Sequence, residues 1–454
     1  MSGSIYTLLI VESPVLAKTI QRVAPSSVYV MATGGFCWKP DYNAEKNSLK
    51  PVADPDKLDF RNELREQAKW AGNIVVASDT DPSGDFIAWS VSRFLKSAVL
   101  LRGRIRRISK SGIVQTLTET TRLNDRVLEQ RLKNRYLIRG LWNSEPSLPV
   151  FEYAAVASLF SSYVPYSRFL GENGNEYRSS QLLTANPDEW IQVRPNPGLN
   201  EFKSYKPLST FDVLEMCVAE GLAPNYARAQ ELLQELFQTA LPSSNEALIS
   251  YPRTDSNAFY SETWDALRTQ YLSFGNQNGL KPIFLQEIAD DDDPHESIHP
   301  LRLDLTPNQA NGELRSDLAG LYSRIYEETV KALAIPEELN EPLTNDFNPE
   351  LYFYPSGDAS DSHPASLRPV RSASDAGHRL VEPELISPSR YGEQLDRWIA
   401  DQLLSVQSGY LTPGKKLSPY LDSADRYHTL FRQLKSLMNN SSLSPETVKR
   451  ILTS

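Results

Sequence analysis

Acidic side chains follow two apolar segments of the chain that are typical of buried strands. Glu12 comes directly after residues 6–11, and a group of aspartates follows residues 73–78. These aspartates are Asp79, Asp81 and Asp85. The carboxyl ends of neighbouring parallel strands meet at one edge of a sheet, so the carboxylates should share a crevice. Such oxygens suit Mg²⁺, although acids in these positions also cap helices.

A tyrosine stands at the end of another apolar segment. Residues 248–256 read Leu-Ile-Ser-Tyr-Pro-Arg-Thr-Asp-Ser. Pro252 favours an extended backbone at Tyr251, so that the phenol projects from a defined position. Because a phenol has a pKa of about 10, nucleophilic attack at neutral pH requires a nearby cation, and Arg253 lies two residues on. The segment indicates a nucleophilic tyrosine, whereas a lone tyrosine at a strand end is ordinarily core packing.

Residues 294–300 read Pro-His-Glu-Ser-Ile-His-Pro and allow two interpretations. Read as His-Glu-x-x-His, they match a zinc protease signature with His295 and His299 as ligands and Glu296 as base. That arrangement needs a helix, whereas the flanking prolines and the preceding run of aspartates favour a loop. We therefore expect extended or loop structure here, and the zinc protease stays the less favoured alternative.

The charge of the chain is unevenly distributed. The 454 residues include 47 basic and 57 acidic ones, giving a net charge of −10, which argues against coating nucleic acid through bulk charge. Residues 102–139 are the exception, since nine arginines and two lysines stand there against three acidic residues. This stretch is either a solvated helix face or a surface for phosphates.

Composition narrows the class of protein further. Hydrophobic residues make up 40% and charged residues 23%, which is typical of a folded soluble protein, and the length suggests about three domains. The two cysteines, Cys37 and Cys217, cannot form a disulfide framework or a four-cysteine zinc module. No Gly-Lys-Ser or Gly-Lys-Thr tripeptide occurs, so ATP is not expected as a partner. The N-terminus resembles neither a signal peptide nor a membrane span, and we expect a cytoplasmic protein.

The periodicity of apolar residues predicts the elements that position these groups. Strands over 6–11 and 73–78 alternate with helices over 16–23 and 85–99, which indicates a parallel α/β layer within the first 125 residues. Two helices beginning at Ser209 and Pro224 resemble a helix-turn-helix unit. Other helices are expected over 310–335, from Tyr391 and from Ser444, while 355–389 is expected to be a linker or loose loops.

Three of these motifs together resemble the type IA DNA topoisomerases. Ile10-Val11-Glu12-Ser13-Pro14 and Asp79-x-Asp81-x-x-Gly84-Asp85 look like the two motifs of their Toprim domain. Residues 248–256 look like their active-site segment, and residues 294–300 resemble the histidine segment that follows it. The motifs occur in the family's order along most of the chain. The chain therefore resembles a divergent and compact member of this family.

The resemblance implies roles for individual residues. Tyr251 would attack a DNA phosphodiester to form a 5′-phosphotyrosine, Arg253 would steady the phosphate, His295 would lie near it, and Glu12 would act as acid or base at the leaving oxygen. The implied Mg²⁺ ligands are Glu12, Asp79, Asp81 and Asp85. The residues expected to face nucleic acid are Arg106, Arg107, Arg135, Arg139 and Asp255.

The resemblance also implies a toroidal, α/β plus α-rich multidomain fold. The expected parts are a Toprim domain at 1–125, a helical DNA-binding domain at 126–165 completed by 386–430, shortened gate or arch segments at 166–206 and 342–385, a helix-turn-helix-like tyrosine domain at 207–341, and a helical tail at 431–454. The implied function is ATP-independent topoisomerase activity on single-stranded regions of negatively supercoiled DNA, in the cytoplasm at the nucleoid.

Several positions depart from the family pattern. Ser83 and Pro82 replace a glutamate and an arginine of the acidic motif, and Asp85 is shorter than the family's last glutamate. The lysine that follows the first glutamate in the family is absent, with Lys18 nearby. These departures motivate a second hypothesis, a cleavage-impaired relative that binds single strands through basic and aromatic side chains.

Overall fold

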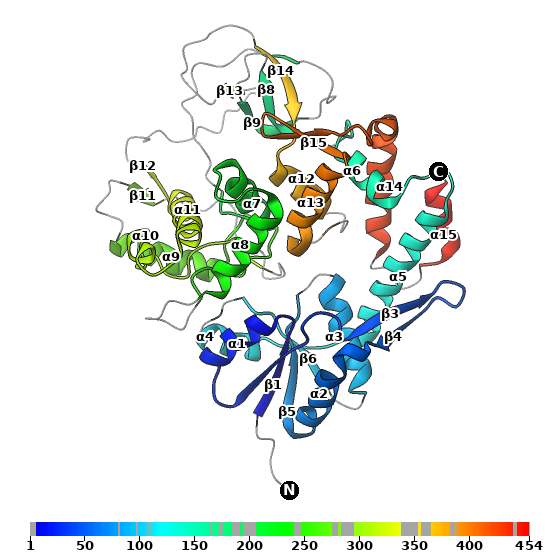
Figure 1. Ribbon diagram of the computed structural model, residues 1–454, viewed down its shortest axis with the longest axis vertical. Coiled ribbons are helices and arrows are strands. Elements are labelled where there is room, and N and C mark those ends of the chain that lie inside the picture. Colours follow the sequence, from blue (N-terminus) through cyan, green and yellow to red (C-terminus); the bar gives the residue numbers. More distant parts are fainter. Residues whose placement is uncertain are drawn as a thin grey trace.

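The computed structural model describes most of the chain. The described residues are 6–79, 82–96, 99–106, 108, 110–163, 166–171, 176–183, 191–193, 206–239, 247–274, 280–282, 295–336, 353–355, 365–381, 386, 388–438 and 443–453. Within these residues, no helix is long and apolar enough to cross a lipid bilayer. A mostly parallel sheet lies at one end of the molecule, a second sheet lies at the other, and helices lie between them (Figure 1).

The N-terminal sheet confirms the predicted α/β layer. Its strand order is β2-β1-β5-β6-β7, with all neighbours parallel except β6 and β7. The strands are β1 (Tyr6–Val11), β2 (Val28–Ala32), β5 (Ala71–Val76), β6 (Leu100–Arg102) and β7 (Thr121–Arg122). Leu9 and Val75 face one apolar core, whereas Leu8 and Ile74 face another. The central strands are buried on both sides, which explains their continuous apolar sequence.

Helices cover both faces of this sheet, and a hairpin packs into the core on one face. The helices are α1 (Pro14–Val23), η1 (Pro55–Lys57), α2 (Leu58–Trp70), α3 (Pro82–Phe94) and α4 (Lys110–Thr118), and the hairpin strands are β3 (Trp38–Asn43) and β4 (Ser48–Ala53). The Ser13 hydroxyl caps α1 by accepting the Leu16 N–H at 3.3 Å, and Pro14 occupies the first helical position. This local signal starts the helix directly after Glu12.

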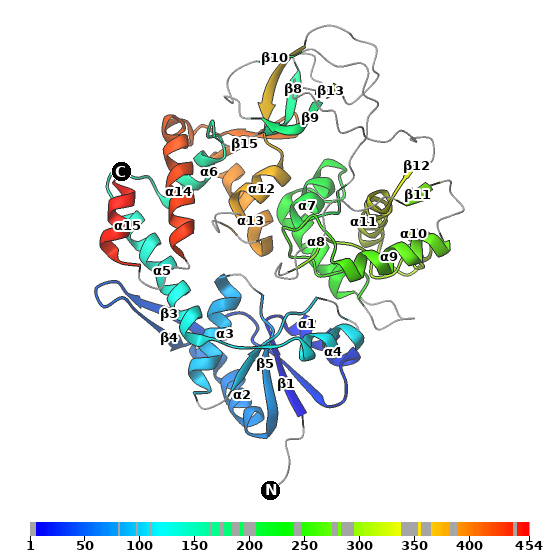
Figure 2. The ribbon, with the colours of Figure 1, turned by 180° about the vertical axis from the view of Figure 1, so that it is seen from behind.

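A helical body lies above one side of the sheet and contains the C-terminus (Figure 2). It includes α5 (Asp125–Ser144), α6 (Phe151–Ser158), η4 (Ser418–Ser423), α14 (Ala424–Met438) and α15 (Pro445–Leu452). The Trp142 and Phe431 rings stack with centroids 4.9 Å apart, and Asn134 Nδ2 donates to the Met438 carbonyl at 2.8 Å. The segment expected as a C-terminal tail therefore packs into this body, with α14 and α15 both against α5.

The tyrosine lies in a second helical group. Its helices are α7 (Thr210–Ala219), α8 (Tyr226–Gln238), α9 (Ser261–Phe274), α10 (Pro307–Asn311) and α11 (Ser316–Leu333), with a small strand pair β11 (Leu280–Pro282) and β12 (Ala334–Pro336). The capping box predicted at Ser209 and Asp212 is present. Gly221 has a φ of 72°, which the turn between α7 and α8 requires. The second helix starts at Tyr226, because Asn225 and not Pro224 provides the cap.

The prediction of a loose linker over 355–389 is wrong for residues 365–381. There the chain forms β14 (Ala365–Val370) and α12 (Ala373–Val381), followed by η3 (Pro388–Arg390) and α13 (Tyr391–Ala400). The small residues that suggested a loop instead allow α12 to approach α7 closely, and Gly377 lies directly against the Phe211 ring. Arg371 is fully buried, where it pairs with Asp375 at 2.6 Å.

The second sheet joins the two segments expected to form the gate or arch. Its order is β10-β14-β8-β9-β13, and all neighbouring strands are antiparallel. Besides β14, the strands are β8 (Tyr166–Gly171), β9 (Glu176–Leu183), β10 (Ile191–Val193) and β13 (Phe353–Pro355). A hairpin of β15 (Leu404–Gln407) and β16 (Tyr410–Pro413) lies below it (Figure 1). Strands that are distant in sequence thus form one sheet.

Replacing Gly377 by alanine should destabilise the fold. The added Cβ would lie 2.4 Å from the Phe211 ring. Because Phe211 is fully buried, either α12 or the ring must move. We expect a loss of about 1–3 kcal/mol in the free energy of unfolding, measured by urea denaturation. The matched control is Gly140→Ala in α5, where the new Cβ meets nothing within 4 Å. That change should be neutral or stabilising, and equal effects at both sites would contradict the close packing.

Candidate active site at the edge of the N-terminal sheet

The sheet brings Glu12 and Asp79 to one edge. Strands β1 and β5 pair in parallel with Ile10 opposite Val76, and the Ala77 N–H donates to the Ile10 carbonyl at 2.8 Å. Glu12 and Asp79 follow these two strands, so both carboxylates leave the sheet at its carboxyl end, as the sequence predicted. Arg102 fixes the turn, because its guanidinium donates at 2.7 Å to the carbonyl of Asp79.

Tyr251 meets this edge from the second helical group. Its hydroxyl donates a short hydrogen bond to Asp79 Oδ1, although 172 residues separate the two in sequence. Arg253 Nη1 donates to Asp79 Oδ2 at 2.9 Å. The tyrosine is 6% exposed, and its ring packs edge-on against Phe237 with centroids 5.5 Å apart. The tertiary fold therefore joins two motifs that the sequence could only place separately.

The strand-like backbone at Tyr251 is held by the histidine segment. The Ser250 N–H donates to the His299 carbonyl at 2.9 Å, and the Leu301 N–H donates to the Leu248 carbonyl at 3.1 Å. Ile298 forms a further bridge, to Leu208 on its other side. Residues 297–301 are thus extended, which confirms the expectation of a non-helical segment.

This conformation contradicts the zinc protease interpretation. The His295 ring lies against Tyr251, whereas His299 Nε2 lies 3.3 Å from Glu296 Oε1 in a buried pair. Without a helix the two histidines do not converge as ligands. In the part of the chain that the structure describes, no three ligand-type side chains form a group able to hold a metal ion.

His295 is held in its neutral form. Its ring centroid lies 4.3 Å from that of Tyr251. Burial lowers the pKa of His295 to about 4, and the positive charges of Arg104, Arg253 and Arg106 act in the same direction against the opposing charge of Asp79. At neutral pH the imidazole can therefore accept or donate a hydrogen bond without adding positive charge to the site.

The resting arrangement keeps the proton on the phenol. Burial and the negative charges of Asp79 and Glu12 raise the pKa of Tyr251 well above its usual value, despite the nearby Arg253. Burial also disfavours the Asp79 carboxylate, but Arg253, Tyr251 and His295 outweigh it and hold the pKa of Asp79 below its usual range. Tyr251 is consequently positioned but not activated in this state.

Asp85, an expected metal ligand, forms ion pairs with two arginines. This residue is buried at the start of α3, and its Oδ2 lies 3.5 Å from Arg131 Nη1 and 3.6 Å from Arg135 Nη1. Two arginines of α5 thus neutralise it, so Asp85 joins the sheet domain to α5 and is a poor candidate for a metal ligand. In this structure Arg135 is directed at Asp85, and its contact with nucleic acid stays a prediction.

The remaining expected residues lie in different surroundings. Arg106 stacks over the Tyr260 ring at 4.5 Å and so spans from the sheet domain to the tyrosine group, while Arg139 lies over the Phe151 ring at 5.2 Å and is exposed. Asp255 is exposed beside the site. Lys18 is exposed on α1. Asp81 and Arg107 lie outside the described residues.

The fit of this site to Mg²⁺ is incomplete. Glu12 and Asp79 are the two expected ligands that lie together, but Asp79 already binds Tyr251 and Arg253. Asp85 is paired with arginines. As described, these side chains do not form a preassembled magnesium site.

Lowering the pH should destabilise the protein through His295. The unfolded chain gains a proton at His295 below a pKa of about 6.5, whereas the folded chain does so only near its pKa of about 4. Stability should therefore fall between these values, by at most about 3 kcal/mol from this residue. Urea unfolding at several pH values compares the native protein with His295→Gln, whose pH dependence should be shallower. Parallel curves would show that His295 is not the source.

Comparison with known proteins agrees with this architecture. A family model for the Toprim domain matches residues 7–110, which contain the sheet, Glu12 and Asp79. The solved structure of full-length topoisomerase I from Thermotoga maritima superposes with a TM-score of 0.65 at 16% sequence identity, covering 98% of this chain and 89% of that one. The chain thus shares the fold of that topoisomerase I and has a Toprim domain over residues 7–110.

Similar sequences include proteins named DNA topoisomerase 1. DNA topoisomerase 1 of Mycoplasma genitalium is 23% identical over 446 residues, covering 78% of this chain and 62% of that protein. DNA topoisomerase 1 of Thermotoga maritima is 23% identical over 386 residues, covering 75% of this chain and 60% of that protein. The chain therefore spans about three fifths of the length of these curated relatives.

Proposed function

We propose that the protein is an ATP-independent type IA DNA topoisomerase. It cleaves single-stranded DNA in negatively supercoiled duplexes through a 5′-phosphotyrosine at Tyr251, passes a strand and reseals the break, in the cytoplasm at the nucleoid. The observation that carries the proposal is the meeting of Tyr251 and Arg253 on the Asp79 carboxylate of the Toprim edge. The names of the sequence relatives support DNA as the substrate.

Arg253 gives the site a way to respond to substrate. In the resting state its guanidinium binds Asp79 and lowers the basicity of that carboxylate. A phosphodiester offers an alternative acceptor with matching bidentate geometry. When Arg253 turns to the phosphate, Asp79 loses its principal cation and becomes the stronger base. The Tyr251 proton then passes along the existing hydrogen bond to Asp79 Oδ1.

The covalent step exchanges one phosphoester for another. The Tyr251 oxygen forms a bond to phosphorus as the bond to the 3′ oxygen of the DNA breaks. Glu12, at the neighbouring strand end, is ionised in the resting state, so it takes up a proton from solvent and delivers it to that leaving oxygen. The neutral imidazole of His295 donates a hydrogen bond to the phosphate. Resealing is the reverse reaction. Because the phosphotyrosine retains the ester bond, no ATP is required.

Mg²⁺ is a further part of the proposal, supported by the Toprim match and by the family resemblance. Glu12, Asp79 and Asp81 are its proposed ligands, and a metal ion there would offset the negative charge of the phosphate. Since the described side chains do not form a ready site, the steps above depend on the chain's own residues.

The second candidate function is a cleavage-impaired relative that binds single strands. Two observations favour it, namely the high pKa of the Tyr251 phenol and the replacement of an acidic-motif glutamate by Ser83. Basic and aromatic groups such as the Arg106–Tyr260 pair would then serve in binding alone.

Covalent trapping distinguishes the two candidates. The purified chain is incubated with Mg²⁺ and with single-stranded oligonucleotides labelled at either end, and is then denatured. A 5′-phosphotyrosine predicts that the 3′-labelled fragment, and not the 5′-labelled one, migrates with the protein. Relaxation of negatively supercoiled plasmid without ATP tests strand passage. Binding without any adduct would support the impaired relative, and absence of binding would exclude both.

A further inference from the structure

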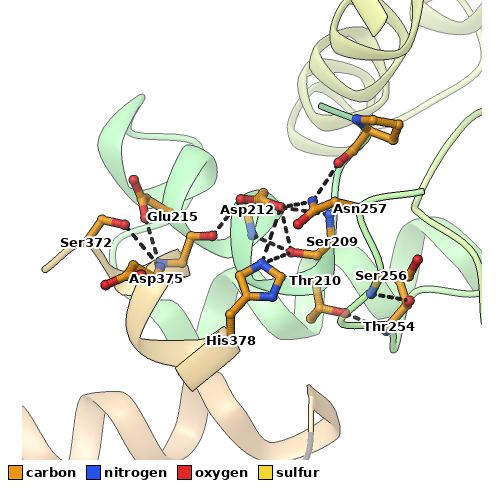
Figure 3. A network of polar contacts seen from close by, with 12 residues as sticks. Ser209, Thr210, Asp212, Glu215, Thr254, Ser256, Asn257, Ser372, Asp375 and His378 are labelled. Atoms are coloured by element: carbon orange, nitrogen blue, oxygen red, sulfur yellow. Dashed lines mark hydrogen bonds and ion pairs between the residues drawn. The ribbon is translucent and has the colours of Figure 1, made fainter. Parts of the chain in front are cut away.

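Asp212, near the start of α7, accepts hydrogen bonds from two directions (Figure 3). Its Oδ2 accepts from the Ser209 N–H at 2.9 Å, from the Ser209 hydroxyl at 2.5 Å and from Asn257 Nδ2 at 2.6 Å. Its Oδ1 accepts from the hydroxyl of Ser374, on α12, at 2.5 Å. One carboxylate therefore completes the N-terminal cap of α7 and also holds a helix that lies 162 residues away in sequence.

His378, also on α12, extends the network. Its Nε2 lies 3.1 Å from Ser209 Oγ and 3.9 Å from Asp212 Oδ2. Because the Ser209 hydroxyl donates to Asp212, its oxygen accepts from His378, so the hydrogen bonds run from His378 through Ser209 to Asp212. Serine rather than histidine is in the middle, which differs from the order of a nucleophilic triad. The arrangement is suited to holding α12 in a fixed position against the start of α7.

The donors around Asp212 keep it ionised. Burial opposes the charge, but the nearby His378 and the hydrogen bonds from Ser209 and Ser374 outweigh it and hold the pKa of Asp212 well below its usual range. A charged acceptor strengthens each of these bonds relative to a neutral one. Two of the three side chains, Ser374 and His378, belong to α12, so the strength of the α7 cap depends on where α12 lies.

The first residue of α7 contacts the active-site segment, residues 251–254, directly. The Thr210 hydroxyl donates to the Pro252 carbonyl at 2.8 Å and accepts from the Thr254 N–H at 2.8 Å. The Thr210 N–H donates to the Thr254 carbonyl at 2.8 Å. Two of these bonds hold the peptides on either side of Arg253 and the third holds the peptide that follows Thr254. Both threonines are 1% exposed. The start of α7 therefore fixes the backbone that carries the nucleophile.

We infer that Asp212 is a positioning residue for the active-site segment and that Ser374 and His378 of α12 complete it. The inference rests on the proposed function. With α12 packed on α7, the capped helix start holds Thr210, and Thr210 fixes the backbone of residues 251–254. If α12 moves away, the cap loses two contacts and the segment is held less firmly. Correct placement of Tyr251 is thereby coupled to closure of the α7–α12 contact.

Asp396 provides a matched control. It lies on α13 and its carboxylate accepts from the N–H groups of Tyr226 at 3.3 Å and Ala227 at 2.7 Å, at the start of α8. It thus caps α8, the helix after α7, from α13, the helix after α12. No contact described for Asp396 involves residues 251–254. Its removal weakens the interface without acting on the active-site segment.

Hydrogen exchange tests the coupling without DNA. Ser374→Ala should raise amide exchange in residues 250–256 by about fivefold, because the segment opens more often. Asp396→Asn should raise exchange at the start of α8 and leave residues 250–256 unchanged. Equal exchange in residues 250–256 for the two variants would overturn the inference, and so would no change in Ser374→Ala. Circular dichroism verifies that both variants are folded.

Cleavage kinetics test the consequence for chemistry. With a saturating 3′-labelled oligonucleotide, Ser374→Ala and His378→Ala should form the covalent adduct about fivefold to tenfold more slowly while Kd changes by less than about twofold. Asp396→Asn should match the native rate. If Asp396→Asn slows cleavage equally, or if Kd alone changes, the inference fails while the proposed function stands. If the native protein forms no adduct, the proposed function fails and hydrogen exchange still decides the coupling.

Discussion

Tyr251→Phe should abolish covalent capture of DNA, reducing the adduct by at least about a thousandfold. The substitution removes one oxygen and leaves the ring, whose packing against Phe237 and His295 is apolar. Asp79 keeps its ion pair with Arg253, so no buried carboxylate is left without a cation. The fold and single-strand binding should therefore persist, and the change isolates the nucleophile. The measurement is the single-turnover yield of protein-linked, 3′-labelled oligonucleotide.

Tyr271→Phe is the control for this experiment. Tyr271 lies on α9 in the same helical group, is also buried at 4% exposure and is remote from the Toprim edge in sequence and in its contacts. Its loss of a hydroxyl should leave the adduct at the native level. An adduct that survives in Tyr251→Phe would place the nucleophile elsewhere, and peptide mapping of the labelled protein would find it.

Arg253→Ala should slow cleavage about a hundredfold while weakening binding by less than about tenfold. The guanidinium is expected to stabilise charge on the phosphate during attack, an interaction stronger in the transition state than in the ground state. Its removal also leaves Asp79 without its principal cation, so the pKa of Asp79 should rise. Cleavage rates at saturating oligonucleotide and separately measured Kd values distinguish the two effects.

Arg228→Ala provides the charge-matched control for Arg253. Arg228 is on α8, where its ion pairs with Glu231 and Glu235 lie at the surface. Its removal should leave the cleavage rate unchanged. Equal slowing in the two variants would indicate a general effect of charge on DNA binding. A native cleavage rate in Arg253→Ala would exclude Arg253 from the chemistry.

The local features of the site could be predicted because their signals are short-range. Two apolar runs ending in acids defined β1, β5 and the edge where Glu12 and Asp79 meet. Pro252 predicted extended backbone at Tyr251, and the prolines around the histidine segment predicted the absence of a helix. Serine caps marked the starts of α1 and α7. Each of these features depends on residues within a few positions of one another.

Other features depended on partners that no local pattern reveals. The sequence suggested Asp85 as a metal ligand, but α5 directs Arg131 and Arg135 at it. Residues 365–381 looked like a linker because they are small and polar. They form α12, which Phe211 and α7 cover, and β14, which pairs with β8 and β10. An indication was present in the spacing of Ala373, Ala376 and Leu380, which are all buried on one face of α12.

The sequence by itself determined the chemical inventory of this protein and its local geometry. It supplied a strand-end carboxylate pair, a tyrosine followed by proline and arginine, and a histidine in extended backbone. The tertiary structure alone decided that Tyr251 donates to Asp79, that His295 is buried and neutral, and that α12 completes the cap beside Thr210. The reason is physical, since strand ends and helix caps arise from near neighbours, whereas burial and charge pairing at the site are set by segments more than 100 residues apart.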